Sequence, residues 1–153
     1  MAAQFWRAAV QKAARFCQPK QLPGADSAMK KLGKLGVLKK RSEFLFVREG
    51  SYQARGGIVI QARKNPNSSI IRVGFTATKK VGNAVIRNRA KRRMRSVALE
   101  TLPQLGRKGM DYVFIARNST TTTPYDALVG DAQKALSSLA QMTKNSNNKN
   151  QNG

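Results

Sequence analysis

The segment 79–95 constrains the fold more than any other part of the chain, because it must be buried on one side and densely charged on the other. It holds eight Lys or Arg residues and no Asp or Glu. At 100° per residue from Asn83, its apolar side chains form one helical stripe, made of Ile86, Ala90, Met94 and Val97. Roughly opposite lie Arg87, Asn88, Lys91, Arg92 and Arg95, with Arg89 and Arg93 flanking the stripe. Such a helix needs a polyanionic partner, which indicates nucleic acid.

The composition supports a folded, strongly cationic protein. The chain has 153 residues, a formal net charge of +22 and a hydrophobic fraction of 41%. It is too apolar for a disordered polycation and too basic for an ordinary enzyme of small metabolites. Like-charge repulsion should destabilise the compact state, and a bound polyanion should relieve it.

Several kinds of protein-based chemistry are excluded. There is no histidine and only one cysteine, Cys17, so a Cys/His zinc site, a Ser-His-Asp triad and an intrachain disulfide are impossible. The seven acidic residues are scattered, without the spacing of a metal site or an acid/base pair. We therefore expect no catalytic or metal-binding residues. No apolar stretch reaches the roughly 18 residues that span a bilayer. We expect no membrane partner for the folded domain, and no obligate protein partner is evident.

Three regions are expected along the chain. Residues 1–36 form an N-terminal extension, residues 37–142 the folded domain, and residues 143–153 a disordered Asn/Lys-rich tail. The basic, amphipathic stretch 4–16 is compatible with a transit peptide, a membrane-surface helix or an unstructured extension that precedes a functional start at Met29. We favour the last interpretation.

The expected elements alternate between helix and strand. Ser42 is a candidate N-cap for a short helix over 43–48, and two strands over 58–63 and 70–77 are expected to pair as a hairpin around the turn 65–68. The basic helix should run from Asn83 to about Leu102.

A strand over 111–117 should be buried on both faces. After Pro124, a last helix should have its core stripe at Leu128, Ala132, Ala135, Leu136 and Leu139. The fold class is a two-layer α/β sandwich, with helices packed on a small mixed sheet and the basic helix linking two neighbouring strands.

Residues 71–95 resemble the signature of the bacterial ribonuclease P protein component family. The most specific part is Gly-Asn-Ala-Val-x-Arg-Asn-Arg-x-Lys-Arg at residues 82–92. Residues 38–44 and 111–117 match in the same order, and the resemblance covers about residues 37–140.

The resemblance implies a cofactor of a catalytic RNA. In this family the RNA subunit cuts precursor tRNA at its 5′ end using bound Mg²⁺, and the protein contacts both that RNA and the single-stranded 5′ leader. The expected partners are therefore ribonuclease P RNA and precursor tRNA, in the bacterial cytoplasm. The family's fold contains a left-handed crossover through the basic helix, against the general right-handed preference.

The resemblance also implies which residues bind RNA. The basic motif carries over to Arg87, Asn88, Arg89, Lys91, Arg92 and Arg95, and Lys80 matches a further motif lysine. Lys79 is added for its position beside Lys80. Guanidinium groups bind phosphate bidentately, and Asn88 suits a base edge, a ribose or a magnesium-bound water. Lys79 and Lys80 precede a helix N-terminus, which itself attracts phosphate.

The family's leader cleft maps onto Phe44, Arg48 and Gln61. Phe44 matches a cleft aromatic on which a base can stack, although core packing explains it equally well. Arg48 and Gln61 stand where further aromatics are expected, which leaves leader affinity and base preference open. The orientation of Arg72 and Arg117 is also undecided.

Three alternatives remain. A ribosomal-type or chaperone-like RNA-binding protein has similar composition, a DNA-binding module would place the basic helix in the major groove, and a protein-only nuclease would need carboxylates that are scattered here.

Overall fold

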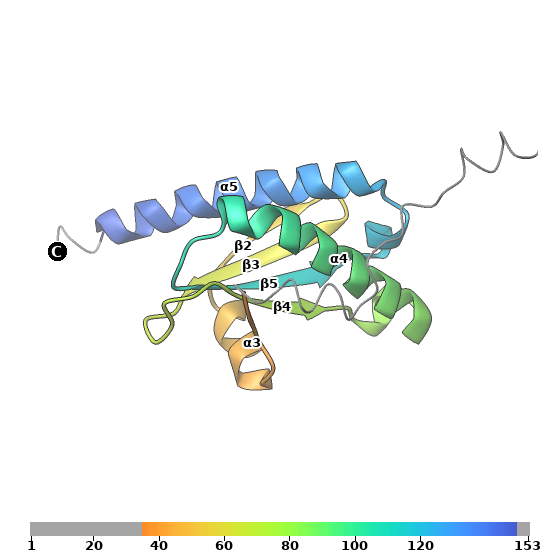
Figure 1. The fold of residues 1–153 in the computed structure, drawn as a ribbon, viewed down its shortest axis with the longest axis horizontal. Coiled ribbons are helices and arrows are strands. Elements are labelled where there is room, and N and C mark those ends of the chain that lie inside the picture. The colour runs from red at the N-terminus through yellow and green to blue at the C-terminus, as the bar shows by residue number, and fades with distance from the viewer. Residues whose placement is uncertain (1–34, 150–153) are drawn as a thin grey trace, which may run out of the picture.

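The computed structural model describes residues 35–149, which form one five-stranded mixed sheet with helices on both faces (Figure 1). The strands are β1 (Gly36–Val37), β2 (Ser51–Arg55), β3 (Ile58–Lys64), β4 (Arg72–Thr76) and β5 (Met110–Ala116). The helices are α3 (Arg41–Arg48), α4 (Ala84–Leu105) and α5 (Tyr125–Lys149), with 3₁₀ turns η2 (Lys79–Val81) and η3 (Asn118–Thr121). The interpretations of residues 1–34 lie outside this part of the chain.

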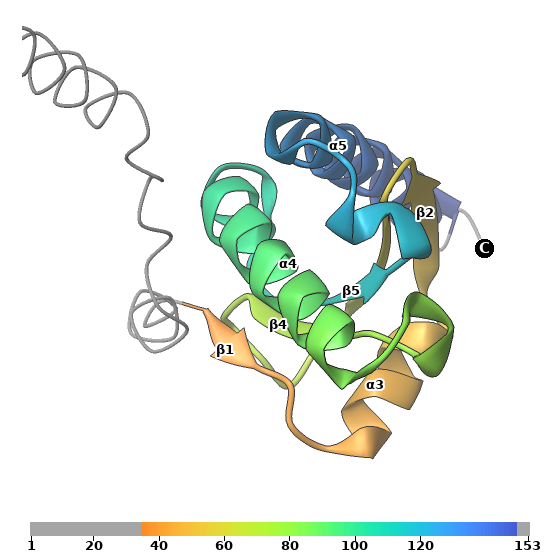
Figure 2. The same cartoon turned by 90° about the vertical axis from the view of Figure 1, so that its right-hand side faces the viewer.

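Strand β5 occupies the centre of the sheet, whose order is β1-β4-β5-β3-β2. Every β5 residue but Ile115 is buried, as its continuous apolar sequence predicted. It runs parallel to β4 and antiparallel to β3. Helix α4 joins β4 to β5 on the face that α5 also covers, and the views in Figures 1 and 2 show this crossover to be left-handed.

The expected hairpin between the strands at 58–63 and 70–77 is wrong. Both strands exist, but β5 lies between them, and β3 instead forms a hairpin with β2. The turn between β2 and β3 is Gly56-Gly57, with Gly56 at φ +35°, a conformation that favours glycine. Strand β2 was not predicted, because its residues are largely exposed and lack an apolar run.

The main core lies between the sheet and helices α4 and α5. The predicted stripes are confirmed at Ala90, Met94 and Val97 of α4 and at all five α5 positions, which are buried. They pack against Ile58, Ile60 and Phe114. Ile86 was predicted in this stripe but is 38% exposed, because it lies in the first turn of α4, at the edge of the core. Among residues 35–149, the opposite face carries a single helix, α3, over a small cluster around Val47 and Val113 (Figure 1).

Three predicted element ends differ from the structure. Helix α3 starts at Arg41 with Lys40 as its N-cap, so Ser42 lies inside the helix and does not cap it. Helix α4 continues through Pro103 to Leu105, because proline is tolerated there at the cost of one backbone bond. Helix α5 continues to Lys149, within the predicted disordered tail.

Candidate RNA-binding site

The start of α4 is a rigid, positively charged corner. The Asn83 side chain accepts a hydrogen bond from the backbone N–H of Ile86 at 3.0 Å, which caps the helix. Gly82 precedes it at φ +139°, where a Cβ would meet the Ile86 side chain at 2.9 Å. The exposed Lys79 and Lys80 lie in the turn η2 just before this cap. The N-terminus of α4, with its helix dipole, therefore lies next in the chain to two exposed lysines, which suits a phosphate.

Only part of the basic face that the helical periodicity predicted on α4 is exposed to solvent. Asn88, Arg89 and Arg92 are exposed, and they form the solvent face. Arg87, Lys91 and Arg95, four residues apart, are half-buried along one flank of the core stripe. Arg89 was predicted at a flank of the stripe and is instead exposed on the solvent face. The most accessible cations on α4 are thus Arg89 and Arg92.

Some motif arginines also have structural contacts. Arg93 donates to the carbonyl oxygen of Thr120 at 2.6 Å and to that of Thr123, which fixes η3 against α4. Burial, together with the charge of Arg89, lowers the pKa of Arg93. The Arg95 guanidinium lies 5.8 Å from the centre of the Phe75 ring. Among described side chains, Nε of Arg87 is the buried nitrogen without a hydrogen-bond partner.

A second surface lies on the opposite face of the sheet, beside α3. In β3, Ile58, Ile60 and Ala62 point into the main core, so Gln61 points to the α3 side. The strand registers align Gln61 with one residue on each neighbouring strand of this face. The aligned row is Tyr52, Gln61, Val113 and Gly74.

Helix α3 covers one end of this row and leaves the other open. Phe44 packs on Gly74, where a Cβ would meet its ring at 2.6 Å, and Val47 packs beside Val113. Gln61 is only half-buried, and Tyr52 is 65% exposed. Phe44 therefore has the packing role that the sequence left open, with a half-buried ring still bordering the surface. Arg48 is exposed at the last turn of α3.

The next row of the same face is a shallow, largely apolar floor. It consists of Ala54, Val59, Ile115 and Thr76, in register across four strands. None of the four is buried, in contrast to the main core on the other side. From Thr76 the chain leads directly to Lys79 and Lys80. This open floor thus ends at the cationic corner of α4.

Helix α3 is held in place by an ion-pair network. Arg72 contacts the Asp111 carboxylate at 2.8 and 2.5 Å and that of Glu43 at 2.7 Å. Asp111 is fully buried, so Arg72 is committed to structure rather than to the cleft. Glu43 also accepts the backbone N–H groups of Lys40 and Lys39, which, with Arg72, lower its pKa below the ordinary 4.5 against an opposing effect of burial.

Tyr52 is the surface residue that the sequence did not reveal. In the sequence, a strand at this position was indicated only by the alternation of Tyr52 and Ala54 with polar residues. Such an alternation is weak evidence without a known partner strand. Its register places it directly beside Gln61, the position where an aromatic was expected. Arg117 is exposed just beyond β5, and its guanidinium reaches the carbonyl of Gly56 at 3.4 Å.

The described residues do not fit a protein-held metal ion. Within residues 35–149 no group of three His, Cys, Asp or Glu side chains could hold one. Glu43 and Asp111 are already bound to Arg72. In the same part of the chain, no helix has the length and apolar character to cross a membrane.

A comparison with known protein families finds a match over most of the chain. The family profile described as ribonuclease P matches residues 32–140. The chain belongs to the ribonuclease P protein family. It is 48% identical over 121 residues to the ribonuclease P protein component of Ruegeria pomeroyi, covering 77% of this chain and 96% of that protein.

Solved ribonuclease P proteins share its fold. The one from Staphylococcus aureus is 25% identical with a TM-score of 0.54, covering 71% of this chain and 94% of the other. The one from Thermotoga maritima is also 25% identical with a TM-score of 0.54, covering 63% and 91%. The resemblance of residues 71–95 and the α/β fold class are thereby confirmed. Both candidate surfaces of this ribonuclease P protein lie within the matched range.

Proposed function

We propose that this chain is the protein subunit of a ribonuclease P ribonucleoprotein, in which it binds the catalytic RNA and the 5′ leader of precursor tRNA. The observation that carries the proposal is the pairing of two surfaces. A cationic helix covers one face of the sheet, an open apolar floor lies on the other, and Lys79 and Lys80 lie where they meet.

The α4 surface is suited to structured RNA. Arg89 and Arg92 are exposed, and neither forms an ion pair among the described residues, so their guanidinium groups are free to bind phosphates bidentately. Lys79, Lys80 and the N-terminus of α4 add a phosphate site at the helix start. Arg87, Asn88, Lys91 and Arg95 complete the proposed RNA-binding set.

The opposite surface is suited to single-stranded RNA. A leader strand lying on the floor formed by Val59 and Ile115 would meet Phe44 and Arg48 on the α3 side and Gln61 and Tyr52 along the row. Aromatic and guanidinium planes accept stacked bases of any sequence. Tyr52 supplies the exposed ring that position 61 lacks, so the cleft retains a stacking platform.

Hydrolysis is assigned to the RNA subunit, with Mg²⁺ bound mainly by that RNA, in the bacterial cytoplasm. The protein contributes charge and contacts. The RNA subunit and its substrate repel each other, and a protein of net charge +22 lying between them reduces that repulsion. It should therefore lower the Mg²⁺ concentration needed for substrate binding, and leader contacts should favour precursor over mature tRNA.

The decisive experiment is precursor-tRNA cleavage by a bacterial ribonuclease P RNA at low Mg²⁺, with and without the full chain. We expect cleavage at the mature 5′ end only when both are present, and none with protein alone. Tight RNA binding without stimulation would contradict the proposal and support a ribosomal-type or chaperone-like protein. Cleavage by the RNA-free protein would instead support a protein-only nuclease.

A further inference from the structure

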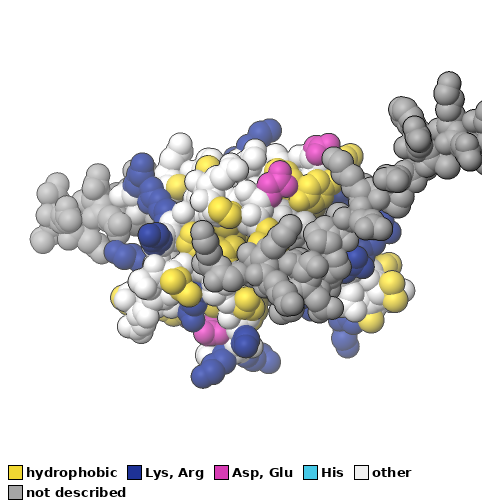
Figure 3. Space-filling model, viewed as in Figure 1, with side chains coloured by type: hydrophobic (Ala, Val, Ile, Leu, Met, Phe, Trp, Pro, Cys, Tyr) yellow, Lys and Arg dark blue, Asp and Glu magenta, His cyan; other side chains and the backbone are white. Residues whose placement is uncertain are grey.

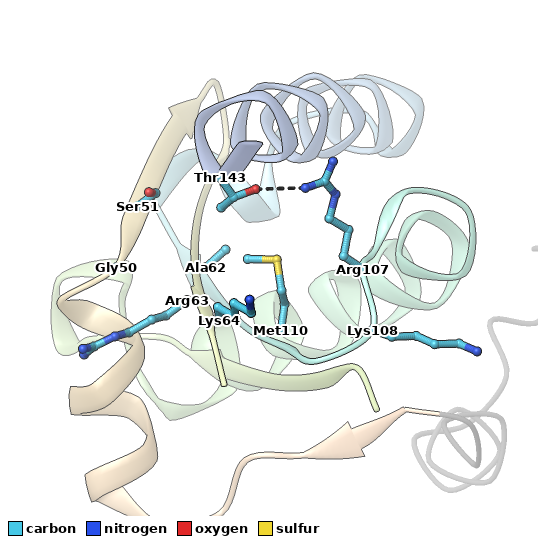
Figure 4. A pocket seen from close by; sticks show the side chains of 9 residues that line it. All are labelled: Gly50, Ser51, Ala62, Arg63, Lys64, Arg107, Lys108, Met110 and Thr143. Carbon is cyan, nitrogen blue, oxygen red and sulfur yellow. Dashed lines mark hydrogen bonds between the residues drawn. The ribbon is translucent and has the colours of Figure 1, made fainter. Parts of the chain in front are cut away.

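A separate basic pocket lies at the end of the sheet away from Lys79 and Lys80. It forms where β3 ends, β5 begins and the loop after α4 meets α5, and its volume is about 320 Å³ (Figure 4). The lining residues are Gly50, Ser51, Ala62, Arg63, Lys64, Arg107, Lys108, Met110 and Thr143. Four of these nine are Lys or Arg and none is acidic, so the pocket is strongly cationic.

Two of the four cations are directed toward the pocket and lack a neutralising partner. Arg107 reaches Thr143 Oγ1 at 3.3 Å, and Lys64, the register partner of Met110 on the neighbouring strand, lines the same pocket (Figure 4). Neither forms an ion pair within the described residues. Arg63 differs, because it is paired with Glu49 at 2.7 Å and stacks on Phe46 at 4.0 Å. Lys108 extends away from the pocket (Figure 4).

Arg107 is held in position before any ligand arrives. Its backbone N–H donates to the Tyr112 hydroxyl at 3.1 Å, and its half-buried side chain is fixed at Thr143. A guanidinium has five N–H donors, and the bond to Thr143 uses only one of them. Preorganisation of this kind reduces the entropy lost on binding an anion.

We propose that this pocket binds a phosphate group of RNA between Arg107 and Lys64, so that the domain contacts RNA at both ends of its sheet. The inference rests on the RNA-binding part of the proposed function. The volume accommodates a phosphate with its ribose, and Ala62 and Met110 give an apolar floor for the sugar. The space-filling view shows basic side chains at both ends of the molecule, as two-ended contact requires (Figure 3).

The test compares two double variants of the full chain with equal loss of charge. R107Q/K64Q removes the two unpaired cations directed toward the pocket, and K39Q/K134Q removes two exposed lysines outside both surfaces. Affinity for a bacterial ribonuclease P RNA is measured against salt concentration. We expect the pocket variant to bind several-fold more weakly, with a log–log salt slope smaller by about 0.7–0.9 for the lost phosphate. Equal weakening by both variants would overturn the proposal.

A local probe separates this site from the α4 surface. Met110 lines the pocket, whereas Met94 is a buried residue of α4. Methyl-labelled methionine therefore reports on the pocket and on α4 separately. RNA should shift the Met110 methyl resonance in the wild type but not in R107Q/K64Q. An unchanged Met110 signal in a wild-type complex with RNA would refute the pocket proposal but not the proposed function. Absence of any RNA binding by the wild type would refute the proposed function.

Discussion

At the scale of single residues, Tyr52 is the side chain on which leader binding should depend most. Its ring is 65% exposed and adjacent to Gln61, on a face where Phe44 is partly used for packing against Gly74. Loss of one stacked base costs about 1–3 kcal/mol. We therefore expect Tyr52→Ala to reduce the preference for precursor over mature tRNA by about fivefold or more, measured as the ratio of the two dissociation constants.

Tyr52→Phe is the matched control for this prediction. It keeps the aromatic plane and removes only the hydroxyl, so the preference should remain within about twofold of wild type. A substrate with its leader shortened to one nucleotide should be insensitive to both changes. If Tyr52→Ala weakened mature and precursor tRNA equally, Tyr52 would not contact the leader.

Glu43 should make the stability of the domain depend on acid. Its pKa is lowered in the folded state, first by the Lys40 backbone N–H and also by Arg72, so the folded state binds the proton less tightly than the unfolded one. This contribution is present above the ordinary value of 4.5 and is lost as the pH falls through the lower folded pKa. Glu43→Gln should thus be less stable than wild type at pH 7, and the difference should shrink toward pH 3.

Urea unfolding at several pH values measures this effect. Exposed Glu49, which pairs with Arg63 at the other end of α3, provides a comparison. Because surface ion pairs contribute little, Glu49→Gln should change stability much less than Glu43→Gln. A constant difference between wild type and Glu43→Gln from pH 7 to pH 3 would show that the Glu43 charge is not the cause.

Residue roles were predictable from the sequence only where a continuous motif carried them. Lys79, Lys80 and Arg92 are exposed as expected, and Arg89 is more exposed than its flanking position predicted. Tyr52 was missed because its significance depends on its register with β3, which no local pattern specifies. Arg72 was undecided for the same reason, since its partners Asp111 and Glu43 are 39 and 29 residues away.

At the scale of elements, α4 is both a core helix and a binding surface. Different side chains serve the two roles. Arg89→Ala with Arg92→Ala removes two exposed charges without touching the core. We expect at least tenfold weaker binding to ribonuclease P RNA and an unchanged unfolding temperature, measured by filter binding and circular dichroism. The Arg93→Ala variant should show the opposite behaviour to the Arg89/Arg92 double variant.

Arg93 is expected to act on stability rather than on RNA affinity. Its side chain satisfies two carbonyl groups around η3, those of Thr120 and Thr123. Their loss should lower the free energy of unfolding by about 1–3 kcal/mol, because partly buried acceptors are left unpaired. Should Arg93→Ala weaken RNA binding as much as the Arg89/Arg92 variant at full stability, this division of roles would be wrong.

Long, strongly periodic elements were predictable, whereas their pairing was not. Helices α4 and α5 and strand β5 follow from the 3.6-residue and continuous apolar patterns. The wrong hairpin between β3 and β4 arose because strands adjacent in sequence usually pair. Here β5, apolar apart from the ion-paired Asp111, takes the central place, which buries both of its faces, and its two neighbours are thereby separated.

At the scale of the whole molecule, the net charge of +22 should limit the stability of the RNA-free protein. The η2 turn and α4 concentrate cations on one side, and only three ion pairs form among residues 35–144. Raising the ionic strength from about 0.01 to 0.15 M shortens the screening length from about 30 to 8 Å, which weakens this repulsion. The unfolding temperature of the free protein should therefore rise by several degrees, as measured by calorimetry.

Ribonuclease P RNA should raise the unfolding temperature further at low salt, because bound phosphates neutralise the same charges. This second effect should diminish as the salt concentration increases. If the unfolding temperature fell with added salt, net attraction among the charges would dominate, and relief of self-repulsion would not explain how RNA stabilises the domain.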